Sequence, residues 1–178
     1  HNLAIALSKK NEYEVTGSDD EIFEPSYSRL KENGLLPREI GWFPERIHKN
    51  LNAVILGMHA AEDNPELIRA KELGIHIYSF PEYLFQQTRS KTRIVVGGSH
   101  GKTTTTSMVS HILLAGDCDP TISVGGILPA IGGNIRVGNS GTFITEACEY
   151  TNSFLHFFPK ISVILNIEED HLDFFKDL

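Results

Sequence analysis

The stretch VVGGSHGKTTTT, residues 95–106, constrains the fold more than any other part of this chain. It joins the apolar run TRIVVGG to the segment KTTTTSMVSHILLAG, which predicts a strand, a glycine-rich loop and a helix in direct succession. Four threonines in a row are poor helix formers, so helix propensity alone would not select them. In this arrangement main-chain N–H groups can approach an anion at the helix N-terminus, which indicates a phosphate site.

The loop departs from the strict pattern G-x-x-x-x-G-K-[ST], because Val96 stands where that pattern has its first glycine. The residues predicted to bind the nucleotide are consecutive, namely Gly98, Ser99, His100, Gly101, Lys102, Thr103 and Thr104. Lys102 is placed to reach the outer phosphates of ATP, and the Thr103 hydroxyl to coordinate magnesium. The alternative is a glycine turn with a solvated lysine and threonines, but motif and context together favour phosphate binding.

Strands and helices alternate along the chain, which predicts an α/β fold with a parallel sheet covered on both faces. Strands are predicted at NEYEVTGSD, NAVILGM, IHIYS, TRIVVGG, TISVGG, TFITEAC and ISVILNI. In DNPELIRAKELG, Asn64 is a predicted N-cap, Pro65 the first helical residue and Gly74 the residue just past the end. Other helices are predicted at the start of the chain, in EPSYSRLKENG and in PEYLFQQT.

The polar joint RSKTR predicts a domain boundary near Ser90. We therefore predict a Rossmann-like domain over residues 1–90 and the first part of a P-loop ATPase-type α/β domain over residues 91–178.

Composition and charge narrow the classes of function. The formal net charge of −7 argues against a general nucleic-acid or anionic-membrane surface. No apolar run approaches the roughly 20 residues that cross a bilayer, and the first residues do not resemble a signal peptide. Cys118 and Cys148 are too few for a disulfide framework and are expected to be reduced. A cytoplasmic location is the resulting expectation.

Acidic residues and a histidine follow two of the predicted strands. Glu146 ends the run TFITE, Glu149 comes shortly after it, and His171 follows the strand ISVILNI. Ligands of open α/β sheets bind beyond the carboxyl ends of the strands, so Glu146 is placed to hold a hard cation there. The alternatives are helix capping or solvation for the acidic residues and a structural role for the histidine.

Three motifs in order, GGSHGKTTTT, EACEY and NIEEDHLDFF, resemble the Mur ligases of peptidoglycan synthesis, and the resemblance covers nearly the whole chain. It implies that Thr103 and Glu146 bind one magnesium ion and that His171 helps to bind a second. It also implies that Lys102 contacts an ATP phosphate and that Asn166 lies close to the nucleotide.

The same resemblance implies that Ser99 and His100 reach the carboxylate or phosphate of the substrate, although His100 is equally well explained as a solvated loop residue. In the family, the first domain opens with a glycine-rich loop before H-x-L-A, and this sequence begins at that histidine. We therefore expect residues 1–90 to be a UDP-sugar-binding domain without its first strand and glycine loop, and the family's C-terminal domain to lie outside the chain. Asp19 is implied to meet the ribose or uracil, with an Asx-turn as the alternative, and His59 to lie near the UDP.

The activity that the resemblance implies is ATP-dependent amide ligation. The reaction would join L-alanine, or a murein tripeptide, to UDP-N-acetylmuramate through an acyl-phosphate intermediate. LGMHAAEDNPELIRAKELG resembles family members that add the tripeptide, whereas SVGGILPAIGGNIRVG resembles those that add alanine. A non-catalytic nucleotide-binding module is the alternative from another class, and this piece alone is expected to be inactive.

Overall fold

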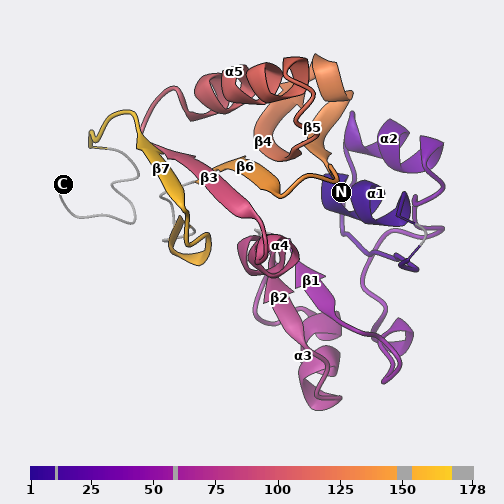
Figure 1. The fold of residues 1–178 in the computed structure, drawn as a ribbon. Helices are drawn as coiled ribbons and strands as arrows, with labels where there is room; N and C mark the ends of the chain where they lie inside the picture. Colours follow the sequence, from indigo (N-terminus) through magenta and orange to yellow (C-terminus); the bar gives the residue numbers. More distant parts are fainter. Residues whose placement is uncertain (11, 58–59, 148–153, 170–178) are drawn as a thin grey trace. The chain divides into compact units, whose positions relative to one another are not determined.

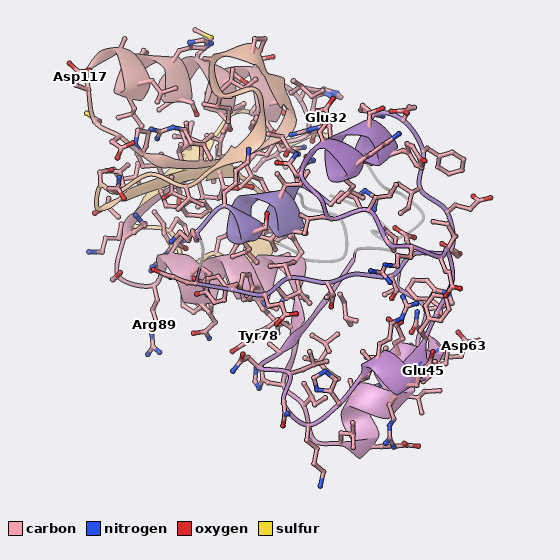
Figure 2. All side chains as sticks on the ribbon, turned by 90° about the vertical axis from the view of Figure 1, so that its right-hand side faces the viewer. Glu32, Glu45, Asp63, Tyr78, Arg89 and Asp117 are labelled. Atoms are coloured by element: carbon pink, nitrogen blue, oxygen red, sulfur yellow. The ribbon has the colours of Figure 1, made fainter. Side chains whose placement is uncertain are left out.

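The computed structural model describes residues 1–10, 12–57, 60–147 and 154–169, and the chain divides into two compact units, His1–Phe80 and Pro81–Leu178 (Figure 1). The division precedes most of helix α4 (Phe80–Thr88) instead of following it at Ser90. The reason is that Arg93 donates hydrogen bonds to the carbonyl oxygens of Thr88 at 3.0 Å and Arg89 at 2.9 Å. These bonds attach the end of α4 to the second unit, while the side chain of Arg89 projects away from the ribbon (Figure 2).

The first unit contains a small parallel sheet connected by a helix. Its elements are helices α1 (Asn2–Ser8), α2 (Ser26–Glu32) and α3 (Pro65–Glu72), the 3-10 turn η1 (Pro44–Arg46), and strands β1 (Val54–Leu56) and β2 (Ile77–Ser79). Strands β1 and β2 pair in parallel, with α3 between them in the sequence. The predicted limits of α3 are confirmed, because the Asn64 side chain accepts hydrogen bonds from the backbone N–H groups of Glu66 and Leu67, and Gly74 has a φ of +68°.

One predicted strand of this unit is wrong. Residues 13–18, within NEYEVTGSD, form no strand, and Asp19 makes only an isolated bridge with Gly41. The segment has little to bury, because Val15 is half-buried between the exposed residues Glu14 and Thr16. Without an apolar face, its short run of strand-forming residues does not compete for a place in a sheet.

The second unit is built around a five-stranded sheet. Its elements are β3 (Thr92–Gly97), α5 (Lys102–Ala115), β4 (Thr121–Leu128), the 3-10 turn η2 (Pro129–Ile131), β5 (Gly133–Arg136), β6 (Thr142–Glu146) and β7 (Ile161–Ile164). The strand order is β5-β4-β6-β3-β7, and every pairing is parallel except that of β4 with β5. The predicted α/β class with a mainly parallel sheet is confirmed.

Strand β5 was not predicted from the sequence. It follows a tight reversal after η2, where Gly132 takes a φ of +62°, a conformation that favours glycine. The chain therefore turns back on β4 and adds an antiparallel strand at one edge of the sheet.

Helix α5 packs on one face of this sheet (Figure 1). The buried cluster beneath it consists of Ile122, Val124, Leu128 and Ile144, against which Val109, Leu113 and Leu114 of the helix pack. Thr106 and Ser110 on the same helix are fully buried, and their small side chains let the helix lie close to the strands. Across the described ranges, no helix combines the length and apolar character needed to traverse a membrane.

Candidate functional site

The loop between β3 and α5 depends on two glycines. Gly98 has a φ of +135° and Gly101 a φ of +83°, and Gly101 is the residue directly before the helix. A Cβ atom on Gly98 would also lie 3.1 Å from the main-chain N and O atoms of Asn166. Both positions therefore require glycine: Gly101 for its backbone conformation, and Gly98 for its conformation and for the space beside Asn166.

Lys102 bends back over this loop. Its Nζ donates hydrogen bonds to the carbonyl oxygens of Gly98 at 2.5 Å and Ser99 at 3.2 Å. The ammonium group is thus held at the mouth of the loop, beside the N-terminus of α5. A positive charge and a helix N-terminus at one place attract an anion.

Thr103 of α5 and Glu146 at the end of β6 are joined by a side-chain hydrogen bond. The Thr103 hydroxyl donates to Glu146 Oε2 at 2.7 Å, and the backbone N–H of Gly125 donates to Glu146 Oε1. The parallel register pairs Val96 of β3 with Glu146 of β6, which brings the end of β6 beside the start of the loop. The structure therefore brings Thr103 and Glu146 together at the carboxyl edge of the sheet, next to Lys102 in the first turn of α5.

The donor atoms here suit a hard cation. A hydroxyl and a carboxylate oxygen are ligands that Mg²⁺ accepts, and Mg²⁺ usually keeps several waters beside one or two protein ligands and substrate phosphates. The described ranges contain no group of three or more His, Cys, Asp or Glu side chains that could hold a metal ion. The Thr103–Glu146 pair thus fits a Mg²⁺ ion whose remaining coordination positions are taken by water and phosphate oxygens.

The segment after β7 contacts the loop from the other side. Asn166 Oδ1 accepts from the backbone N–H of His100 at 2.8 Å, and its Nδ2 donates to the His100 carbonyl oxygen at 3.0 Å. The Ser99 hydroxyl donates to the Glu168 carbonyl oxygen at 3.2 Å and accepts from the Glu168 N–H at 3.1 Å. The His100 imidazole also lies 3.6 Å from the Glu168 carboxylate, with both side chains exposed.

The remaining predicted residues lie on α5, in the first unit or outside the described residues. Thr104 is exposed on α5, and Asp19, in the first unit, accepts a hydrogen bond from His1 Nε2 at 2.9 Å. His59, Glu149 and His171 lie outside the described residues, so their roles stay predictions.

Sequence reasoning missed two contributors to the site. Gly125 supplies an N–H group to the Glu146 carboxylate, and a Cβ atom at that position would collide with that carboxylate. Glu168 contributes its main chain to Ser99. The paired glycines of SVGG were an available signal for the first, because glycine inside a strand often marks a close approach of another group.

Comparison with known proteins gives consistent matches. Residues 96–178 match the family model of the Mur ligase middle domain. The UDP-N-acetylmuramate–L-alanine ligase of Clostridium perfringens is 49% identical over 167 residues, which cover 93% of this chain and 36% of that protein. The UDP-N-acetylmuramate–L-alanine ligase of Lachnospira eligens is 48% identical over 177 residues, covering 98% of this chain and 37% of its own length. The chain thus spans somewhat more than a third of the length of these relatives.

Two solved structures share the fold over nearly the whole chain. The UDP-N-acetylmuramate:L-alanyl-gamma-D-glutamyl-meso-diaminopimelate ligase of Neisseria meningitides aligns with a TM-score of 0.85 and 26% identity, covering 98% of this chain and 60% of its own. The UDP-N-acetylmuramate-alanine ligase of Thermotoga maritima aligns with a TM-score of 0.79 and 28% identity, covering 99% of this chain and 41% of its own.

Proposed function

The chain belongs to the Mur ligase family, and on that premise we propose that it is part of an ATP-dependent ligase that joins L-alanine to UDP-N-acetylmuramate. The observation that carries the proposal is the 2.7 Å hydrogen bond between Thr103 and Glu146, beside Lys102 and the glycine loop. A hydroxyl, a carboxylate, an ammonium group and a helix N-terminus at one sheet edge form a site for a magnesium-bound polyphosphate. The curated relatives at 48–49% identity carry the name of an alanine-adding ligase, which supports this choice of amino acid.

The chemistry requires activation of a carboxylate. A carboxylate is a poor electrophile, so we propose that the terminal phosphoryl group of ATP is transferred to the lactyl carboxylate of UDP-N-acetylmuramate. The amine of L-alanine then attacks the carbonyl carbon of the acyl phosphate, and phosphate leaves as the amide forms. Catalysis of phosphoryl transfer rests on positioning and on charge stabilisation, so no protein nucleophile is needed.

Each residue of the cluster has a proposed task in that reaction. Lys102 leaves the carbonyl oxygens of Gly98 and Ser99 and neutralises charge on the phosphates. Thr103 and Glu146 hold Mg²⁺, which when bound would offset the negative charge of the phosphate chain. Gly98, Ser99, His100, Gly101 and Thr104 complete the loop around the nucleotide, and His171 is proposed to hold a second Mg²⁺.

The first unit is proposed to bind the UDP moiety. Asp19 and His59 are the candidates for that contact, and Ser99 and His100 for contact with the muramyl carboxylate. No contact with nucleic acid or membrane is proposed, and the cytoplasm, where ATP and UDP-sugars are available, is the proposed location.

A second candidate function is ligation of murein tripeptide to UDP-N-acetylmuramate. The observation in its favour is the TM-score of 0.85 with a ligase whose name carries that peptide. That protein is 26% identical, against 49% for an alanine-adding relative, so the alanine activity is the better supported of the two.

The test is phosphate release by the complete protein with ATP, Mg²⁺ and UDP-N-acetylmuramate. We expect release to require L-alanine and to yield the amide product by mass spectrometry. Replacing L-alanine with the tripeptide identifies the second candidate. A protein that binds ATP yet releases no phosphate with either amine would be a nucleotide-binding module, and the ligase proposal would be withdrawn.

A further inference from the structure

We propose that Asn166 is a positioning residue that fixes the shape of the phosphate loop through His100 and does not itself contact the nucleotide. The inference rests on the proposed function, since it takes the loop at residues 98–101 to be the site of the ATP phosphates. It gives a positioning role to the side chain that the family resemblance places close to the nucleotide.

The amide of Asn166 is already engaged at both ends. Its oxygen accepts from the His100 N–H at 2.8 Å and its nitrogen donates to the His100 carbonyl oxygen at 3.0 Å. Both main-chain polar groups of a single loop residue are therefore held by one side chain, in the way that a neighbouring strand would hold them. A bound phosphate would have to take its N–H donors from other residues, so His100 contributes loop shape and not an amide.

Two further contacts fix the neighbouring loop residues to the same segment. The Ser99 hydroxyl both donates to and accepts from the main chain of Glu168. Gly98 lies so close to the main chain of Asn166 that a Cβ atom would stand 3.1 Å from its N and O atoms. Three consecutive loop residues thus contact residues 166–168, which we call the brace.

The position of the brace follows from the sheet. Gly97 of β3 pairs with Ile164 of β7, and the Leu165 N–H donates to the Gly97 carbonyl oxygen at 3.1 Å. The strand pairing therefore ends where the loop begins, and side chains take over the hydrogen bonding from there. Asparagine suits this place, because its amide offers one donor face and one acceptor face at fixed separation.

The closing experiment separates loop shape from nucleotide contact by using two probes that share only phosphates. Binding of MgATP and of magnesium tripolyphosphate to the complete protein is measured by calorimetry or competition for wild type, Asn166→Ala and Asn166→Asp. Each lost hydrogen bond costs a few-fold in affinity, so we expect Asn166→Ala to weaken both probes by about tenfold and to the same extent. Asn166→Asp, which replaces the donor with a second acceptor facing the His100 carbonyl oxygen, should weaken both further.

Asn64→Ala is the matched control, because it removes an asparagine whose side chain also makes two hydrogen bonds to main-chain groups, but in the first unit. It should lower the unfolding temperature without changing either affinity. If Asn166→Ala weakens MgATP alone, the side chain contacts the nucleoside and the inference is overturned. It is equally overturned if both Asn166 variants bind the two probes as wild type does. Failure of wild type to bind MgATP would instead refute the proposed function.

Discussion

The two edges of the sheet in the second unit both carry charged side chains, but they hold them in different ways. At the carboxyl edge, Lys102 and Thr103 lie in the first turn of α5 and Glu146 ends β6. The Lys102 ammonium group donates to the loop, and the Thr103 hydroxyl donates to the Glu146 carboxylate. At the amino edge, where the parallel strands begin, the basic side chains donate hydrogen bonds mainly to main-chain carbonyl oxygens. The same sheet thus separates residues suited to a ligand from residues that hold the fold.

The amino edge shows this most clearly at its basic side chains. Arg93, which is buried, donates to the carbonyl oxygens of Thr88, Arg89 and Phe158 at 2.9–3.0 Å. Arg136 donates to the Pro120 carbonyl oxygen at 2.8 Å and pairs with Asp119. These contacts tie together segments that precede the strands, which is a task of folding and not of catalysis.

The strongest test of the contrast is a pair of lysine variants. We expect Lys102→Ala to lower the ligation rate of the complete protein by about 10²–10³-fold, because it removes a preorganised charge from the transferring phosphoryl group. Its unfolding temperature should change little. Lys91→Ala is the counterpart at the other edge, where Nζ donates to the Ser140 carbonyl oxygen. Lys91→Ala should lower stability and leave the ligation rate per folded molecule unchanged. Near-normal ligation by Lys102→Ala would refute the role assigned to Lys102.

Arg93 provides the next largest effect, this time on stability. We expect Arg93→Ala to lower the free energy of unfolding by about 2–4 kcal/mol, since three hydrogen bonds from a charged group to main-chain carbonyl oxygens are lost. Urea unfolding of the complete protein measures it. Arg89→Ala, at an exposed side chain, is the control and should change stability by less than about 0.5 kcal/mol. A loss in the control as large as that in Arg93→Ala would show that the carbonyl contacts are unimportant.

A smaller effect is expected at the carboxylate of the carboxyl edge. Glu146→Gln keeps a side chain of the same size but removes the charge that would attract Mg²⁺. We expect the Mg²⁺ concentration for half-maximal ATP use to rise about tenfold, a difference of roughly 1.4 kcal/mol. A magnesium titration of phosphate release measures it, with Glu72→Gln, in the surface pair with Arg69, as the control. An unchanged Mg²⁺ requirement would remove Glu146 from the proposed metal site.

These edges also show how much the sequence could predict. The position of Glu146 at the ligand-binding edge followed from the apolar run before it, because parallel strands place their carboxyl ends at one edge, and the family resemblance implied its pairing with Thr103. The cap at Asn64 followed from its position before Pro65. Such features depend on local pattern or on a general rule of topology.

The features that the sequence did not predict depend on strand register and on hydrogen bonds to main-chain groups far away in the sequence. Nothing in the run TRIVVGG indicates that Arg93 turns towards the end of α4, and the hydrogen bonds of Asn166 require β7 to end beside Gly97. Strand β5 was missed because GGNIRVG is rich in glycine, which is uncommon in strands. Conversely, the strand expected in NEYEVTGSD failed because its pattern offered no buried face.

The smallest effect, and the finest test of the contrast, concerns the acid sensitivity of Asp119. A hydrogen bond from the backbone N–H of Asn139 at 2.8 Å, followed by the Arg136 guanidinium, lowers the pKa of this carboxyl group. A lowered pKa means that the stabilisation is complete above the unfolded value of about 3.9 and is lost as the pH falls through the folded value. The amino edge should therefore weaken in acid below about pH 4.

Asp119→Asn removes that titration while preserving the left-handed backbone, which asparagine also adopts at the φ of +43° found here. We expect the variant to be less stable than wild type at pH 7 but to lose less of its unfolding temperature between pH 6 and pH 3. Asp117→Asn is a close control, since Asp117 has a φ of +54° and lies in the turn after α5 (Figure 2). If Asp119→Asn and wild type respond alike to acid, the charge of Asp119 does not hold the amino edge, and the contrast between the edges then rests on the basic side chains alone.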